Sequence, residues 1–73
     1  MSSIEDACTM AQRNLEYEKG YSDGYDYAAY GGAYTNPIKE LRLRGIKVNS
    51  SYGVAFRNGY KDRKDYKPKK YDY

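Results

Sequence analysis

The chain repeats one pattern, first as YEKGYSDGYDY at Tyr17–Tyr27 and then as FRNGYKDRKDY at Phe56–Tyr66. Both copies read aromatic-x-x-Gly-Tyr-x-Asp-x-x-Asp-Tyr. On a helix, each copy places a glycine one turn after an aromatic ring. Two such helices can cross at their glycines, with each ring filling the gap left by the other's glycine. The alternative is chance similarity in a chain rich in Tyr and Asp. We favour the interpretation that the two helices cross at these glycines, and we expect this crossing to determine the fold.

The first copy lies in a long predicted helix over residues 3–29. Ser2 or Ser3 can cap its start, and apolar residues recur at helical spacing at Ile4, Cys8, Ala11 and Leu15. Gly20 and Gly24 lie on one side of this helix, although an interior glycine costs about 1 kcal/mol relative to alanine. Either the helix stops near Gly20, or the glycines let another helix approach. We favour the close approach, because the helical pattern continues to the Gly-Gly pair that ends it.

Two further helices follow. Asn36 as cap, Pro37 at the first position and Gly45 at the end predict a short helix near 37–44. A serine cap then starts a second main helix, over residues 51–64, which carries the second copy of the pattern.

The predicted fold is therefore all-α, a small helical hairpin of two main helices with a short central helix. Residues 1–66 form one domain. Residues 67–73 are predicted to be a disordered basic tail, because they have no aliphatic residue and contain Pro68.

The repeat also predicts which residues pack the helices together. They are Tyr17, Gly20, Tyr21, Gly24, Phe56 and Gly59. A leucine at Gly59 should disrupt the crossing, and an alanine there should be milder.

Composition limits the core. Among 73 residues there are nine Ile, Leu, Val and Phe side chains but eleven tyrosines, whose rings are apolar and whose hydroxyls need partners. The single cysteine, Cys8, cannot form an internal disulfide and is expected to be a buried apolar residue. The chain has no apolar run long enough for a membrane span and no basic leader. We expect a monomeric protein of a reducing bacterial cytoplasm.

Charge is segregated along the chain. Residues 1–35 hold two bases and six acids, a balance of −4, whereas residues 36–73 hold eleven bases and four acids, a balance of +7. Solvated surface charge explains most charge runs, but this segregation favours an acidic partner for the second half.

The residues for most enzyme chemistry are absent. The chain has no histidine and one cysteine, which excludes the usual zinc sets and nucleophile–histidine pairs. The carboxylate pairs Asp23/Asp26 and Asp62/Asp65 are expected on solvated helix faces, where they make poor general acids. We predict no enzyme activity and no catalytic, cofactor-binding or metal-binding residues.

Several motifs resemble those of the ribosome modulation factor family. The matching positions cover about half the chain and are Gly20, Tyr21, Gly24, Asn36, Pro37, Ala55, Phe56, Gly59 and Tyr60. The resemblance implies a small helical protein that binds ribosomal RNA. This chain departs from the family pattern at Ile38, where an aromatic is expected, and at Phe56, where tryptophan is usual. It also adds an acidic N-terminal helix and a Tyr/Lys tail.

A second resemblance concerns overall character. Small size, tyrosine richness and charge of two signs are similar to the small regulators by which lytic phages act on host RNA polymerase. Three functions stay open: a regulator that binds host RNA polymerase, a ribosome- or RNA-binding module, and a structural or assembly protein. We place the polymerase first, because the acidic first half would repel phosphate.

The expected partner-binding residues are basic side chains with interleaved aromatics. They are Lys39, Arg42, Arg44, Arg57, Tyr60, Lys61, Arg63 and Lys64, with Tyr52, Phe56 or Tyr60 as the buried anchor.

Overall fold

The described parts of the chain fold into three helices and contain no strand. The computed structural model describes residues 3–31 and 35–71, with side chains from Asn14 onward. Helix α1 spans Ser3–Ala29, α2 spans Pro37–Leu43 and α3 spans Ser51–Lys64. The predicted all-α fold is confirmed, and both main helices have the predicted bounds. The predicted face of Ile4, Cys8 and Ala11 lies outside the described side chains. None of the three helices, as described, combines the length and apolarity that a membrane span needs.

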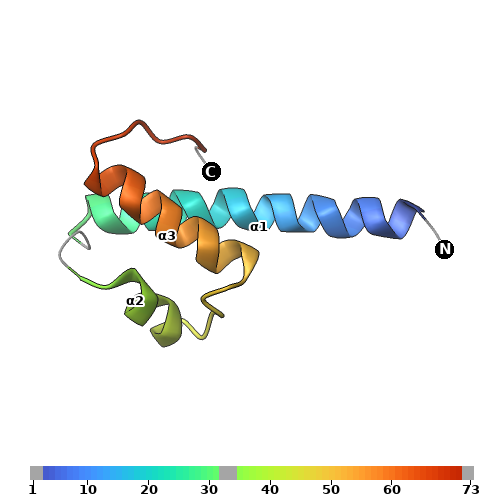
Figure 1. The fold of residues 1–73 in the computed structure, drawn as a ribbon, viewed down its shortest axis with the longest axis horizontal. Coiled ribbons are helices and arrows are strands. Elements are labelled where there is room, and N and C mark those ends of the chain that lie inside the picture. Colours follow the sequence, from blue (N-terminus) through green and yellow to red (C-terminus); the bar gives the residue numbers. More distant parts are fainter. Residues whose placement is uncertain (1–2, 32–34, 72–73) are drawn as a thin grey trace.

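The two main helices cross while running in the same general direction (Figure 1). Gly20 lies against Tyr52 and Gly24 against Phe56, so positions along both helices increase together. After α1, the chain passes through α2 and turns back toward the N-terminal end of α1 before α3 begins. The pair is therefore a crossed parallel pair, in contrast to the antiparallel helices of an ordinary hairpin.

Glycines bring the two backbones together at the crossing. A Cβ atom added to Gly24 would lie 2.7 Å from the carbonyl carbon of Phe56, and one added to Gly59 would lie 2.8 Å from the backbone nitrogen of Tyr25. The glycines thus allow the close packing that we predicted, but the groups that pack against them are different. The partner's backbone occupies the space beside each glycine, where we expected the partner's aromatic ring. Gly20 also faces Tyr52 instead of the second copy of the repeat, so the two copies do not pair symmetrically.

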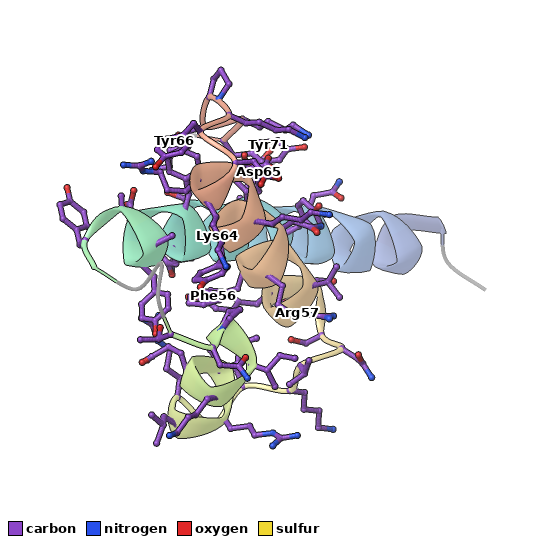
Figure 2. All side chains as sticks on the ribbon, turned by 60° about the vertical axis from the view of Figure 1, so that its left-hand side comes forward. Phe56, Arg57, Lys64, Asp65, Tyr66 and Tyr71 are labelled. Atoms are coloured by element: carbon purple, nitrogen blue, oxygen red, sulfur yellow. The ribbon has the colours of Figure 1, made fainter. Side chains whose placement is uncertain are left out.

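Side chains complete the core around this crossing. Tyr21, Leu41, Ala55 and Phe56 are essentially inaccessible to solvent. Figure 2 shows Phe56 between α3 and α2, and its ring lies 5.5 Å from that of Tyr27. Leu41 is the buried residue of α2. The scarce aliphatic side chains are thereby supplemented by aromatic rings.

The helix starts follow the capping residues in the sequence. The Asn36 side chain accepts a hydrogen bond from the Ile38 amide at 2.9 Å, with Pro37 next to it. The Ser50 hydroxyl accepts from the Gly53 amide at 3.0 Å. These bonds satisfy amides that have no partner within the first helical turn.

Helices α2 and α3 end in the same hydrogen-bonded turn. After α2, the Ile46 amide donates to Leu41 at 2.9 Å, and Gly45 has a φ of +72°. After α3, the Lys67 amide donates to Asp62 at 2.8 Å, and Tyr66 has a φ of +59°. Both are Schellman motifs, which need one residue in the left-handed region. Arg44, predicted as the last residue of the short helix, is the C-cap of α2.

The segment after α3 runs back along α1. The Tyr25 hydroxyl donates to the Lys67 carbonyl at 2.7 Å, and the Lys69 ammonium contacts Asp26 at 2.9 Å. The Tyr71 ring lies 5.3 Å from that of Tyr21 in an edge-on arrangement. These residues have no helical structure, and their predicted disorder in the free protein stays a prediction.

Candidate partner-binding surface

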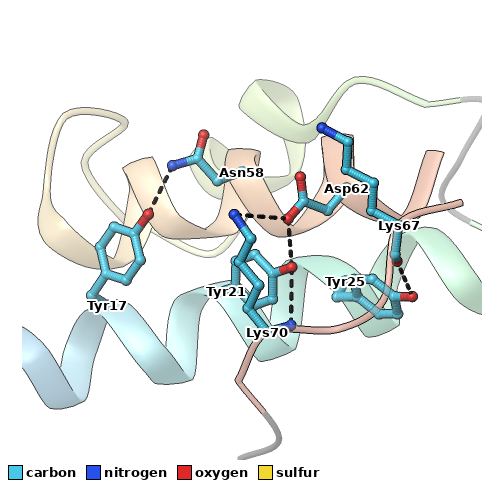
Figure 3. A network of polar contacts seen from close by, with 7 residues as sticks. All are labelled: Tyr17, Tyr21, Tyr25, Asn58, Asp62, Lys67 and Lys70. Atoms are coloured by element: carbon cyan, nitrogen blue, oxygen red, sulfur yellow. Dashed lines mark hydrogen bonds and ion pairs between the residues drawn. The ribbon is translucent and has the colours of Figure 1, made fainter. Parts of the chain in front are cut away.

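A row of tyrosines on α1 bonds to α3 and to the segment after it (Figure 3). Tyr17 accepts a hydrogen bond from the Asn58 amide group at 2.9 Å. One helical turn later, Tyr21 donates to Asp62 at 2.6 Å and accepts from the Lys70 amide at 3.2 Å. These hydroxyls stabilise the crossing and are occupied within the chain.

Two tyrosines at the crossing have strongly perturbed hydroxyls. Burial, and then the hydrogen bond to Asp62, raises the pKa of Tyr21 from 10.0 to about 12. Burial and a hydrogen bond to Asp23 raise the pKa of Tyr52 to about 12 as well. In each pair the carboxylate accepts a hydrogen bond from the phenolic O–H, and a phenolate beside it would add a second negative charge. Both tyrosines therefore act as hydrogen-bond donors throughout the physiological pH range.

Three of the four carboxylates in the two sequence pairs have partners within the chain, and the buried Asp62 corrects the expectation that both pairs lie on solvated helix faces. Asp23 accepts from Tyr52, Asp26 contacts Lys69, and buried Asp62 accepts from Tyr21. Asp65 is exposed just after α3. Within the described residues, no three His, Cys, Asp or Glu side chains are grouped so that they could hold a metal ion. Asp23, Asp26 and Asp62 thus connect α1 to α3 and to the segment after it.

The predicted packing residues lie together at the helix crossing. Gly20, Gly24 and Gly59 face the partner backbone, and Phe56 and Tyr21 are buried. Tyr17, at the edge of the crossing, is half-buried.

The predicted aromatic anchors are part of the core. Phe56 is fully buried, and Tyr60 is 7% exposed with its hydroxyl donating to the Thr35 carbonyl at 2.6 Å. Tyr52 is half-buried and bonded to Asp23. In this conformation none of the three rings is free to enter a partner's pocket.

The predicted basic residues divide between two regions. Lys39 and Arg42 are exposed on α2, while Lys61 and Lys64 are exposed on α3. Figure 2 shows α2 and the C-terminal end of α3 at opposite ends of the molecule. The structure therefore offers two separate basic surfaces.

The remaining arginines make contacts within the chain. Arg44 lies 5.1 Å from the centre of the Phe56 ring and 3.6 Å from Glu40. The half-buried Arg57 donates to the Val48 carbonyl at 3.4 Å. Arg63 lies over the Tyr66 ring at 5.6 Å. Arg44 and Arg57 thus stabilise the packing around α3 more than they extend a binding surface.

Two exposed apolar side chains were not among the predicted partner-binding residues. Leu43, on α2, is 76% exposed, and Tyr66, after α3, is 85% exposed. Leu43 lies between two arginines and two residues after the buried Leu41, which places it on a different helix face. That spacing could have identified it. Tyr66 belongs to the run of basic residues with interleaved tyrosines, which suits RNA or an acidic protein surface, but its exposure depends on how α3 ends.

Leu43 and two basic side chains form one face of α2. Arg42 lies three positions and Leu43 four positions after Lys39, so Lys39 is a neighbour of both side chains on the helix surface. We call Lys39, Arg42 and Leu43 the α2 surface. It combines an exposed apolar group with positive charge.

Comparisons with protein families, curated proteins and solved structures found no match to this chain. The resemblance to ribosome modulation factors consequently rests on the quoted motifs alone.

Proposed function

We propose that this chain is a small non-enzymatic regulator that binds an acidic surface of bacterial RNA polymerase through the α2 surface. It would be phage-encoded and would modulate host transcription, by inhibiting initiation or by antitermination. The observation that carries the proposal is Leu43, an exposed leucine beside Lys39 and Arg42. The choice of RNA polymerase follows from the overall resemblance to small phage regulators.

An apolar group with a charged rim is the usual anatomy of a protein interface. The apolar group contributes affinity when it is desolvated, and the surrounding charges steer the encounter and set specificity. Full burial of a leucine is worth about 1.5–3 kcal/mol. Because Leu43 is 76% exposed in the free chain, its burial by a partner should contribute about 1–2 kcal/mol. That corresponds to roughly 5–30-fold in affinity.

The acidic half of the chain is compatible with such a surface. Asp23 and Asp26, the acids of α1 that lie at the crossing, are bonded to Tyr52 and Lys69. On α2 itself, Glu40 pairs with Arg44. The charges of Lys39 and Arg42 are therefore not opposed by an unpaired carboxylate on α2.

The test compares two leucine variants against purified bacterial RNA polymerase. Leu43→Ser removes the proposed anchor, and Leu15→Ser removes a leucine that is 50% exposed on α1. Both changes replace an exposed helical leucine by the same residue, so their effects on folding should be similar. We expect Leu43→Ser to weaken binding roughly 5–30-fold and Leu15→Ser to leave it within about twofold.

A charge-reversal variant tests the rim. Lys39→Glu combined with Arg42→Glu should mainly slow association, and the effect should shrink as salt rises. Equal affinities of the Leu43→Ser and Leu15→Ser variants would contradict the assignment of the α2 surface. Tight binding to ribosomes in place of polymerase would instead support the alternative, a module of the ribosome modulation factor type.

A further inference from the structure

Tyr66 adopts a backbone conformation that a tyrosine rarely adopts. Its φ is +59°, and it is the one non-glycine residue with positive φ in the described ranges 3–31 and 35–71. At the corresponding position of the turn after α2 the chain uses Gly45. Glycine takes this conformation without steric cost, whereas a residue with a Cβ is strained there. The turn after α3 therefore holds a side chain that its own geometry disfavours.

Burial does not compensate for this strain. Tyr66 is 85% exposed, and the guanidinium of Arg63 lies over its ring, 5.6 Å from the ring centre. Figure 2 shows Tyr66 at the C-terminal end of α3, away from α2. The turn thus presents an aromatic ring to solvent beside an arginine. Strained residues of this kind concentrate at functional sites.

Basic residues are close to Tyr66 in the sequence, although the Lys64 ammonium lies over the Tyr60 ring, 5.8 Å from its centre. Within residues 61–67, Lys61, Lys64 and Lys67 are exposed. Of the two carboxylates in this stretch, Asp62 is buried and bonded to Tyr21, which leaves Asp65 exposed. We call Arg63, Tyr66 and Lys67 the α3 corner.

We propose that the α3 corner binds single-stranded nucleic acid, with a base stacked on the Tyr66 ring and the phosphates beside it held by Arg63 and Lys67. Stacking on an exposed aromatic ring within a basic surface is the common way of binding single strands without sequence preference. The proposal goes beyond binding to RNA polymerase and does not depend on it.

The balance of apolar area and charge favours nucleic acid over a protein at this corner. A protein interface has a core in which apolar groups dominate and charged residues are depleted. Between residues 61 and 67, Tyr66 is the one large apolar side chain that is exposed, and its near neighbours in sequence are mostly basic. A base needs one ring to stack on, and each nucleotide brings a negative charge.

The experiment uses Tyr66→Trp, because the chain contains no tryptophan. The indole keeps a stacking surface and gives one fluorophore at the proposed site. Single-stranded RNA and DNA of about ten nucleotides, and a duplex of the same sequence, are titrated with this variant at low salt. We expect both single strands to quench the fluorescence on binding. The duplex should bind more weakly, because its bases are already stacked on one another.

Tyr66→Gly separates binding from folding. It removes the ring while placing glycine where the backbone favours it, so the fold should be retained. Its affinity for the single strands should fall roughly 5–150-fold, the range for loss of one stacked base. The control is Tyr30→Gly, which removes a tyrosine that is 88% exposed at the end of α1 and should change affinity less than about twofold.

Three results would overturn the proposal. They are an absence of single-strand binding at low salt, strand binding without quenching of the indole fluorescence in the Tyr66→Trp variant, and equal affinities of the wild type and the Tyr66→Gly variant. If Tyr66→Gly weakened binding to RNA polymerase alone, Tyr66 would belong to a protein interface and this inference would fail while the proposed function stood.

Discussion

Replacement of Gly59 by alanine tests whether the glycine crossing holds the fold together. The added Cβ atom would lie 2.8 Å from the backbone nitrogen of Tyr25 and 2.9 Å from the carbonyl carbon of Tyr21, with the Tyr21 oxygen closer still. Non-bonded carbon atoms are normally about 3.5–4.0 Å apart. The obstacle is backbone, which cannot turn away as a side chain can. The two helices would have to move apart by roughly 1 Å.

The expected cost follows from this separation. A gap of about 0.5–1 Å removes a quarter to a half of the dispersion energy of each affected contact, and overpacking of a core typically costs about 1–3 kcal/mol. We take the upper end of this range, a cost of about 3 kcal/mol, because the whole contact between α1 and α3 would open. The higher helix propensity of alanine returns about 1 kcal/mol, which leaves a net loss of about 2 kcal/mol. For a domain of this size, that loss lowers the Tm by about 8–16 °C.

The assay is thermal unfolding followed by circular dichroism. The control is Gly45→Asn, because a Cβ atom there meets no atom within 4 Å and asparagine tolerates the φ of +72°. Its Tm should change by a few degrees at most. Leucine at Gly59 should be worse than alanine, as the sequence analysis expected, but alanine is already too large. A Gly59→Ala variant that melts at or above the wild-type temperature would refute the reasoning.

Three further predictions concern stability and order. Tyr66→Gly should raise the stability by about 0.5–1 kcal/mol in denaturant unfolding, because relief of strain exceeds the entropy cost of glycine, whereas Tyr66→Ala should bring no gain. The folded-state pKa of Tyr21 and of Tyr52 lies above 10.0, so their contribution to stability should be full below pH 10 and lost as the pH rises to about 12; Tyr21→Phe should flatten this dependence. The contacts of residues 67–71 with α1 lead us to expect ordered values in heteronuclear relaxation, whereas flexible values would confirm the disorder predicted from the sequence.

Much of the fold was predictable because its signals are local. Asn36 and Ser50 are residues that cap helices, and both do so in the structure. The glycines of α1 predicted a close approach of another helix, which the structure contains. The register of the crossing was not predictable. The repeat suggested that its copies face one another, but Gly20 lies against Tyr52 because backbone packing, not ring insertion, sets the contact.

The binding surfaces were harder to predict, because exposure depends on how the helices pack. Phe56 and Tyr60 have the composition of interface anchors, yet the small core needs both rings. Leu43 and Tyr66 are apolar residues that the core leaves outside. The basic residues were correctly seen as exposed on α2, while Arg57 turned out to bond to the backbone of Val48.

Salt-dependent titration tests the central claim, binding to RNA polymerase, most directly. Labelled protein is titrated with purified bacterial RNA polymerase and, separately, with ribosomes at several salt concentrations. The account predicts binding to polymerase with a modest loss of affinity as salt rises, because burial of Leu43 supplies part of the free energy. Binding to ribosomes with a steep linear fall on a log–log salt plot, and none to polymerase, would contradict it.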